Sequence, residues 1–277
     1  MIKFTTQRYP QNFSKHKMNN NTTDLEKYFR ANTGRLIHKC KHYFDIYDRH
    51  FKRFRGKEVV ILEIGVSHGG SLQMWKDYFG ENAKIYGIDI DPRCKEFEED
   101  NIEIFIGSQS DRNFLKKVKK SIPKVDILID DGGHTMKQQI VSYEELFDHV
   151  KDDGVYLVED LHTSYWALFG GGHKRRNTFI EYSKNFIDYL NAWHSEQKSL
   201  KVDAFTKSVD SLHYYDSILV IEKSIRERPI DESTGEASFE TPVDGDGIVS
   251  RKLIKKTATK INEILRFFGL PGIYRKM

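Results

Sequence analysis

The chain alternates short apolar runs with longer segments in which apolar residues recur every three or four positions. The short runs are rich in Val and Ile and end abruptly at polar residues, which is typical of buried parallel strands. The longer segments have the spacing of one helix face. This order predicts an α/β fold with a seven-stranded, mostly parallel sheet and helices on both faces. The predicted strands cover residues 58–64, 84–90, 101–106, 125–129, 155–158, 201–208 and 214–222, and the main helices cover residues 35–54, 72–79, 112–121, 136–150 and 177–193.

Changes in composition divide the chain into four regions. Residues 1–56 are predicted to form an N-terminal arm with helices, of which residues 1–21 are irregular, and residues 57–225 form the sheet domain. Residues 226–248 are acidic, turn-rich and poor in apolar residues, as in a linker.

The last region, residues 249–277, is predicted to be a basic amphipathic helix. Its apolar positions are Ile254, Ala258, Ile261, Leu265 and Phe268. Such a helix packs on its own domain, pairs with another subunit or a partner protein, or rests on an anionic membrane surface. The sequence leaves all three open.

Composition excludes several classes of protein. Lys and Arg number 44 against 41 Asp and Glu, a net charge of +3 that is too balanced to indicate a nucleic-acid partner. The two cysteines, Cys40 and Cys94, form no disulfide or metal motif. No signal-peptide pattern or bilayer-spanning run is found, so we expect a cytoplasmic protein.

The first predicted strand leads directly into a glycine-rich turn and a helix, an arrangement suited to a ligand that approaches the backbone closely. Gly65 and Gly69 do not have the spacing of a dinucleotide-binding turn. Glu63 would repel a pyrophosphate but suits the ammonium and sulfonium of S-adenosylmethionine. Asp89, at the end of the next strand, is placed to accept hydrogen bonds from a ribose.

Two later strands end in paired acids, each followed by a histidine. The residues are Asp130, Asp131 and His134 after one strand, and Glu159, Asp160 and His162 after the next. Because the carboxyl ends of parallel strands meet at one edge of a sheet, we expect both groups to face one cleft. Clustered carboxylates repel one another unless a cation lies between them, and oxygen ligands favour Mg²⁺. A simpler interpretation is that these acids only cap helices or face solvent.

These motifs together resemble the class I S-adenosylmethionine-dependent methyltransferases. They are E-I-G-V-S-H-G-G-S (63–71), G-I-D-I-D (87–91), G-S-Q-S-D (107–111), I-D-D-G-G-H (129–134) and V-E-D-L-H-T-S-Y (158–165). Within that class they look most like metal-dependent O-methyltransferases of macrolide sugars, over roughly residues 34–223. The resemblance implies a Rossmann-like sheet in residues 57–225. One departure is Ser67, which stands where the family has a glycine.

The resemblance also implies roles for individual residues. Asp131, Glu159 and Asp160 would bind Mg²⁺, and His134 would be the general base, with Asp131 beside it at the catalytic centre. Predicted cofactor contacts are Glu63, Gly65, Ser67, Gly69, Ser71, Asp89, Ser108, Gln109 and Asp130. Candidate substrate contacts are His162, Tyr165 and Trp166.

The expected activity is S-adenosylmethionine- and Mg²⁺-dependent methylation of a sugar hydroxyl on a glycoside, nucleotide-sugar or polysaccharide. A divalent ion that chelates two neighbouring hydroxyls would lower the pKa of the reacting one. The same chemistry serves a catechol or another small diol. A non-catalytic, cofactor-binding partner of a glycan-assembly enzyme is a further alternative, as is a nicotinamide-dependent oxidoreductase, which the glycine spacing disfavours. The expected partner is a small-molecule or glycan acceptor and no nucleic acid, with a homo-oligomer left open.

Overall fold

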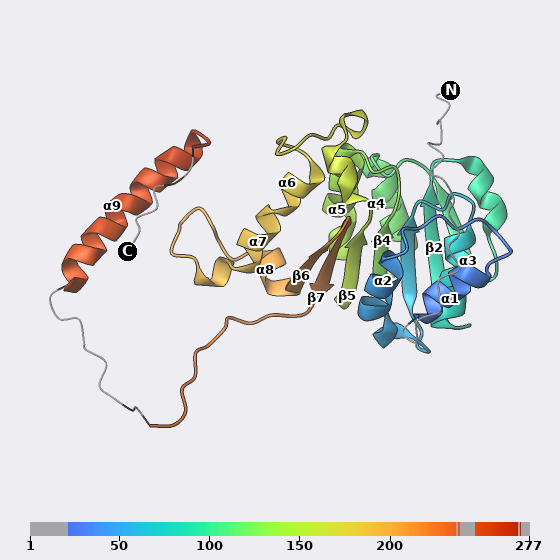
Figure 1. The fold of residues 1–277 in the computed structure, drawn as a ribbon, viewed down its shortest axis with the longest axis horizontal. Coiled ribbons are helices and arrows are strands. Elements are labelled where there is room, and N and C mark those ends of the chain that lie inside the picture. Colours follow the sequence, from blue (N-terminus) through green and yellow to red (C-terminus); the bar gives the residue numbers. More distant parts are fainter. Residues whose placement is uncertain (1–21, 237, 239–246, 271, 273–277) are drawn as a thin grey trace.

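The computed structural model describes residues 22–236, 238, 247–270 and 272, and within α9 it describes only the backbone of residues 247–256 (Figure 1). The predicted irregular arm, residues 1–21, lies outside the described residues.

A single seven-stranded sheet in the order β3-β2-β1-β4-β5-β7-β6 forms the centre of the molecule (Figure 1). Neighbouring strands from β3 to β5 are parallel, whereas β7 runs antiparallel to both β5 and β6. The predicted α/β class with a mostly parallel sheet is therefore confirmed. The strands are β1 (Val60–Ile64), β2 (Lys84–Asp89), β3 (Ile102–Ile106), β4 (Val125–Asp130), β5 (Val150–Val158), β6 (Val209–Tyr215) and β7 (Ile218–Lys223).

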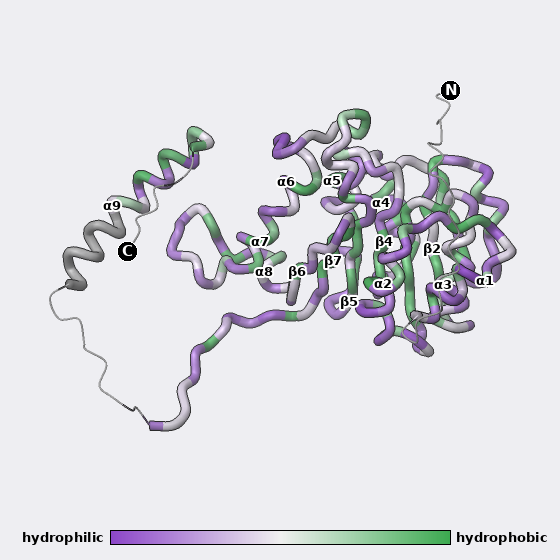
Figure 2. Tube along the Cα trace, viewed as in Figure 1, coloured by the Kyte–Doolittle hydropathy of each residue, from purple (hydrophilic) through white to green (hydrophobic). Residues whose placement is uncertain are grey.

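Helices cover both faces of the sheet, as predicted. Alternate strand residues point to opposite faces, so Ile61 packs in one apolar cluster with Trp75, and Leu62 packs in the other with Leu115. Strands near the middle of the sheet, such as β4, are drawn largely in the green of hydrophobic residues in Figure 2, whereas the edge strand β6 is not. The first cluster includes α1 (Asp24–Ala31), α2 (Tyr43–Phe51) and α3 (Gly70–Phe79). The second includes α4 (Arg112–Ser121), α5 (Met136–Leu146), α6 (Phe179–Ser183), α7 (Asn185–Leu190) and α8 (Ala204–Ser208).

Three predicted elements after β5 are wrong. The strand predicted for residues 214–222 is the end of β6, a turn at residues 216–217 and most of β7. The strand predicted for residues 201–208 is the short helix α8, because Asp203 caps it by accepting a hydrogen bond from the Thr206 backbone N–H at 2.9 Å. The strand β6 begins only at Val209. The helix predicted for residues 177–193 is divided into α6 and α7, which are separated at Lys184.

The predicted helix 35–54 is also wrong in its first part, because α2 begins at Tyr43. The preceding segment is not helical, and its backbone lies against the start of α3. A side chain at Gly70 would place its Cβ only 2.5 Å from the carbonyl oxygen of Arg35 and 2.4 Å from that of Leu36. This contact holds residues 35–39 beside the carboxyl ends of the strands, and Lys39 therefore lies in the cavity described below.

The described residues of the C-terminal region contain one further helix, α9 (Gly247–Phe267). It begins two residues before the predicted helix 249–277 and ends at Phe267. Of the predicted linker, residues 226–236 and 238 form no helix or strand, whereas residues 247 and 248 already belong to α9. The domain boundaries stay a prediction. Among the described residues, no helix combines the length and apolar character needed to cross a bilayer.

Candidate active site

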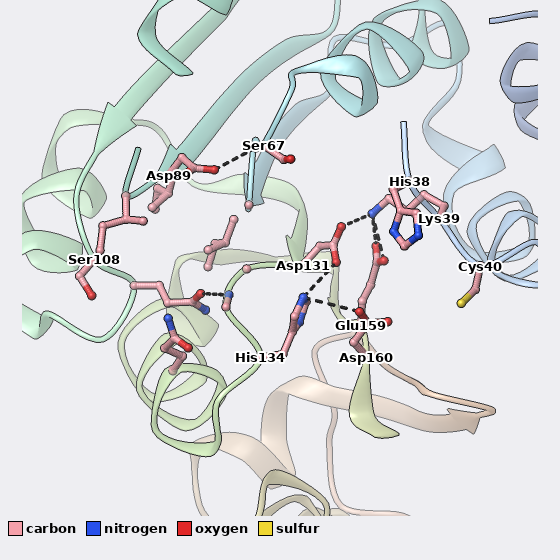
Figure 3. A pocket seen from close by; sticks show the side chains of 18 of the residues that line it. His38, Lys39, Cys40, Ser67, Asp89, Ser108, Asp131, His134, Glu159 and Asp160 are labelled. Atoms are coloured by element: carbon pink, nitrogen blue, oxygen red, sulfur yellow. Dashed lines mark hydrogen bonds and ion pairs between the residues drawn. The ribbon is translucent and has the colours of Figure 1, made fainter. Parts of the chain in front are cut away.

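A cavity of about 850 Å³ lies at the carboxyl ends of the parallel strands, where ligands bind in open α/β sheets (Figure 3). It runs from the ends of β1, β2 and β3 to the ends of β4 and β5. The predicted site residues that line it are Gly65, Ser67, Asp89, Ser108, Gln109, Asp131, His134, Glu159, Asp160, His162 and Trp166. The structure therefore brings most of the predicted residues together in one cavity.

The end of the cavity beside β2 is built around Asp89. Its Oδ2 accepts a hydrogen bond from the Ser67 backbone N–H at 2.9 Å, and its Oδ1 accepts one from the Asp91 backbone N–H at 2.9 Å (Figure 3). Ser67 has a φ of 50°, in the left-handed region that favours glycine. A serine thus occupies the conformation for which the family pattern has a glycine.

Close backbone contacts lock the loops around the cavity. Gly65 has a φ of 99°, and a Cβ there would lie 2.0 Å from the Asp131 carbonyl oxygen, so only glycine fits. Gln109 joins the loops after β3 and β4, because its Oε1 accepts from the Gly133 backbone N–H at 2.7 Å and its Nε2 donates to Asp130 Oδ1 at 2.9 Å. The loop after β4, which carries Asp131 and His134, is therefore held by the loops after both β1 and β3.

Three predicted residues form a group that could hold a metal ion. One ligand atom from each of Asp131, His134 and Asp160 lies within 4.8 Å of the others. His134 Nε2 is 3.8 Å from Asp131 Oδ1 and 3.5 Å from Asp160 Oδ2. His134 and Asp160 both have a φ of 55°, a conformation that costs about 1–3 kcal/mol in a non-glycine residue and is concentrated at functional sites.

Glu159, the third predicted metal ligand, is outside that group. Its carboxylate is buried and accepts hydrogen bonds from Lys39 Nζ at 2.8 and 3.0 Å and from the Tyr47 hydroxyl at 2.6 Å. Burial, with the nearby Asp131 carboxylate, raises the pKa of Glu159 well above its usual value. Its role as a metal ligand stays a prediction.

The Lys39 ammonium is a buried cation within the acidic cluster (Figure 3). Its Nζ lies 2.5 Å from Asp131 Oδ2, 2.8 Å from Glu159 Oε1 and 3.9 Å from Glu63 Oε1. Burial alone would lower the pKa of Lys39, but these three carboxylates outweigh it and raise the pKa above the usual value. Lys39 is therefore protonated and holds the ends of β4 and β5 together.

Sequence reasoning missed Lys39, Tyr43 and Tyr47. The Tyr43 hydroxyl donates to Asp160 Oδ1 at 2.7 Å, so α2 supports both acids that follow β5. The four-residue spacing of Tyr43 and Tyr47 predicted only that they lie on the packed face of a helix. Spacing does not predict which groups their hydroxyls reach. Lys39 belongs to no motif, because its position depends on the nonhelical segment before α2.

Four predicted cofactor contacts do not line the cavity: Glu63, Gly69, Ser71 and Asp130. Glu63 accepts a hydrogen bond from the Ser71 hydroxyl at 2.8 Å, and burial raises its pKa to about 7. Burial likewise raises the pKa of Asp130 to about 7. Both carboxyls lie behind the cavity wall, and direct contact with a ligand stays a prediction for all four residues.

The predicted substrate contacts lie after β5. His162 and Trp166 line the cavity, with their ring centroids 4.6 Å apart, and the His162 Nδ1 lies 2.5 Å from the Ser217 hydroxyl. Tyr165 is exposed and is not among the lining residues. A substrate role for Tyr165 therefore has less support than one for the other two.

The sheet order and the placement of the cavity are those of the class I, Rossmann-like methyltransferase fold. Residues 62–161 match a protein family described as a methyltransferase domain.

Its relatives include O-methyltransferases of antibiotic sugars. Demethylmacrocin O-methyltransferase of Streptomyces fradiae is 36% identical over 190 residues, which are 65% of this chain and 48% of that protein. Mycinamicin VI 2''-O-methyltransferase of Micromonospora griseorubida is 33% identical over 71% of this chain and 51% of that protein. The chain thus spans about half the length of the curated relatives it matches.

A solved structure gives a similar result. The MycE methyltransferase of the mycinamycin biosynthetic pathway, in complex with Mg and SAH, superposes with a TM-score of 0.62 at 30% identity. The superposition covers 76% of this chain and 54% of MycE. MycE has also been solved with Mg, SAH and mycinamycin VI, and this chain is similar to that complex at a TM-score of 0.58.

Lys39→Met tests the role of the buried ammonium. Removing it leaves the Asp131 and Glu159 carboxylates without their buried cation, so we expect the free energy of unfolding to fall by about 3–5 kcal/mol. Urea unfolding at neutral pH in the presence of EDTA measures the change. Lys27→Met is the matched control, because the Lys27–Asp24 pair is half exposed and its loss costs at most about 1 kcal/mol. Equal losses in the two variants would contradict a structural role for Lys39.

Proposed function

We propose that the chain is an O-methyltransferase that transfers the methyl group of S-adenosylmethionine to a hydroxyl of a sugar-bearing acceptor, with Mg²⁺ as its metal. The observation that carries this proposal is the group Asp131, His134 and Asp160, which opens into the same cavity as Asp89 and Ser108. The similarity to O-methyltransferases named for rhamnosyl and olivosyl compounds supports the choice of acceptor.

The cavity suits a cofactor and an acceptor bound side by side. Its volume of about 850 Å³ is near the upper end of ordinary ligand sites, which hold one drug-sized molecule in about 300–1,000 Å³. Asp89 and Ser108 offer a carboxylate and a hydroxyl for the ribose of S-adenosylmethionine. When bound, this cofactor supplies an activated methyl group and a neutral leaving group. The remaining volume, beside Asp131 and Trp166, is left for the acceptor.

The charge of the acidic cluster supports a divalent cation. Glu63, Asp131 and Glu159 surround Lys39, and Asp160 lies beside His134, so one ammonium faces several carboxylates. Asp131 Oδ1 and Asp160 Oδ2 both face His134 instead of Lys39, and carboxylate oxygens are the ligands that Mg²⁺ prefers. Bound there, Mg²⁺ would lower the pKa of a sugar hydroxyl and fix its direction.

His134 is placed to accept the hydroxyl proton at Nε2. This nitrogen lies 3.8 Å from Asp131 Oδ1 and 3.5 Å from Asp160 Oδ2, so the role of base requires that Mg²⁺ bind the two carboxylates and leave Nε2 uncoordinated. The left-handed backbone at His134 turns its ring toward Asp160. The ring therefore faces the cavity at the point where the hydroxyl would lie.

The identity of the acceptor rests on the rim of the cavity. Trp166 is half exposed and offers a flat apolar surface of the kind on which sugar rings stack, and His162 beside it offers a polar atom. These residues fit a glycoside, a nucleotide-sugar or a polysaccharide end equally well.

A cytoplasmic location remains part of the proposal.

His134→Ala tests the general base. We expect kcat to fall by about 10² to 10⁴, the usual contribution of a positioned base, while the Kd for S-adenosylmethionine stays within about twofold. Steady-state kinetics and calorimetric titration of the cofactor measure the two quantities. The matched control is His194→Ala, an exposed histidine in a short turn after α7, which should change neither. A large loss of cofactor affinity in His134→Ala would refute the role of base.

A methyl-transfer screen tests the proposed reaction itself. Purified protein is incubated with labelled S-adenosylmethionine and, in separate reactions, with nucleotide-sugars, glycosides, polysaccharide fragments and a catechol. We expect transfer to a sugar compound that stops with EDTA and returns with added Mg²⁺, because the metal activates the hydroxyl. Full activity in EDTA would exclude the metal role, and transfer to the catechol alone would exclude the sugar acceptor.

A further inference from the structure

The positive charge of the chain is concentrated at its C-terminal end. Of 44 Lys and Arg and 41 Asp and Glu in the chain, residues 249–277 contain eight and one respectively. That segment therefore carries a net charge of +7 and residues 1–248 carry −4. An asymmetry of this size points to a negatively charged partner for the segment.

Helix α9 also presents an apolar side to solvent. No residue from 257 to 270 is buried, and Ile261, Ile264 and Phe268 are 37%, 58% and 68% exposed. Their spacing of three and four residues places them on one side of the helix, where Ala258 and Leu265 also lie. Lys260, Glu263 and Arg266 lie on the other side. The described residues of α9 alternate between hydrophobic and hydrophilic in Figure 2, as this arrangement requires.

We propose that α9 binds flat on the surface of an anionic lipid bilayer. Its apolar side would enter the boundary between headgroups and acyl chains, and the basic residues of the segment would contact anionic headgroups. No helix within the described part of the chain is long and apolar enough to cross the bilayer, so α9 would lie in the plane of the surface.

Charge separates this partner from the two alternatives. Pairing of α9 with α9 of a second copy would bring two segments of +7 together, which is unfavourable. A nucleic acid would satisfy the charge but would leave Ile261, Ile264 and Phe268 in water. An anionic bilayer satisfies both the charge and the apolar side.

Co-sedimentation with lipid vesicles tests the proposal with the full chain. The vesicles contain phosphatidylcholine either alone or mixed with phosphatidylglycerol. We expect binding to the mixed vesicles, little binding to phosphatidylcholine alone, and weaker binding when NaCl is raised from about 0.1 M to about 0.5 M. Ile261→Asp should weaken binding to mixed vesicles by at least about tenfold, because it places a charge in the apolar side.

The matched control is Thr259→Asp, which adds the same charge about 200° around the helix from Ile261. It should retain most of the binding, and thermal unfolding should show that neither variant disturbs the domain. The proposal is overturned if the protein does not bind mixed vesicles, or if the two variants lose binding equally. Self-pairing of α9 would overturn it as well: the protein would then not bind vesicles, and Ile261→Asp would convert a dimer to a monomer in sedimentation velocity. Binding to duplex DNA in preference to vesicles would identify a nucleic acid as the partner and would also overturn it. The assay involves no methyl transfer, so its result does not depend on the proposed function.

Discussion

The arrangement of the site depends on one buried ammonium. Lys39 Nζ lies within 3.0 Å of carboxylate oxygens from both Asp131 and Glu159, which follow neighbouring strands. Unpaired, these neighbouring carboxylates would repel each other, and the buried Glu159 would lose its hydration at a cost of several kcal/mol. With Lys39 between them, the ends of β4 and β5 can each carry a pair of acids. The cluster remains negative overall, which leaves room for a second cation on the side facing the cavity.

The rest of the fold serves to hold this cluster in position. Helix α2 supplies two tyrosine hydroxyls, one to Glu159 and one to Asp160, and the rings of the same tyrosines pack in the core. Gln109 and the close contact at Gly65 fix the loop that carries Asp131. His134 and Asp160 occupy left-handed backbone conformations that this framework stabilises. A rigid framework is what a methyl transfer needs, because the reaction depends on the alignment of oxygen, methyl carbon and sulfur.

The sequence predicted the parts of the molecule that follow from local pattern. Buried strands are visible as Val- and Ile-rich runs, so β1 to β4 and the edge of the sheet that carries the acids were found to within two residues. The strand β5 begins at Val150, five residues before its predicted start. The sequence did not predict features that depend on tertiary contact. The segment before α2 has helical spacing, yet its backbone is held nonhelical by contact with Gly70, and this places Lys39 in the site. The short helix α8 depends on a capping interaction between Asp203 and Thr206 that outweighed the apolar run around it. The buried positions of Glu63 and Asp130, behind the cavity wall, also could not be inferred from their places at strand ends.

The central claim is that a divalent cation and Lys39 share the acidic cluster, with the cation on the side of Asp131 and Asp160 that faces His134. Anomalous diffraction from crystals grown with Mn²⁺ and S-adenosylmethionine tests this most directly, because Mn²⁺ binds the same oxygen ligands as Mg²⁺ and can be located without ambiguity. The account predicts one manganese peak within coordination distance of Asp131 and Asp160, with Lys39 still bonded to Glu159. Crystals with bound cofactor but no manganese between these two carboxylates would contradict it.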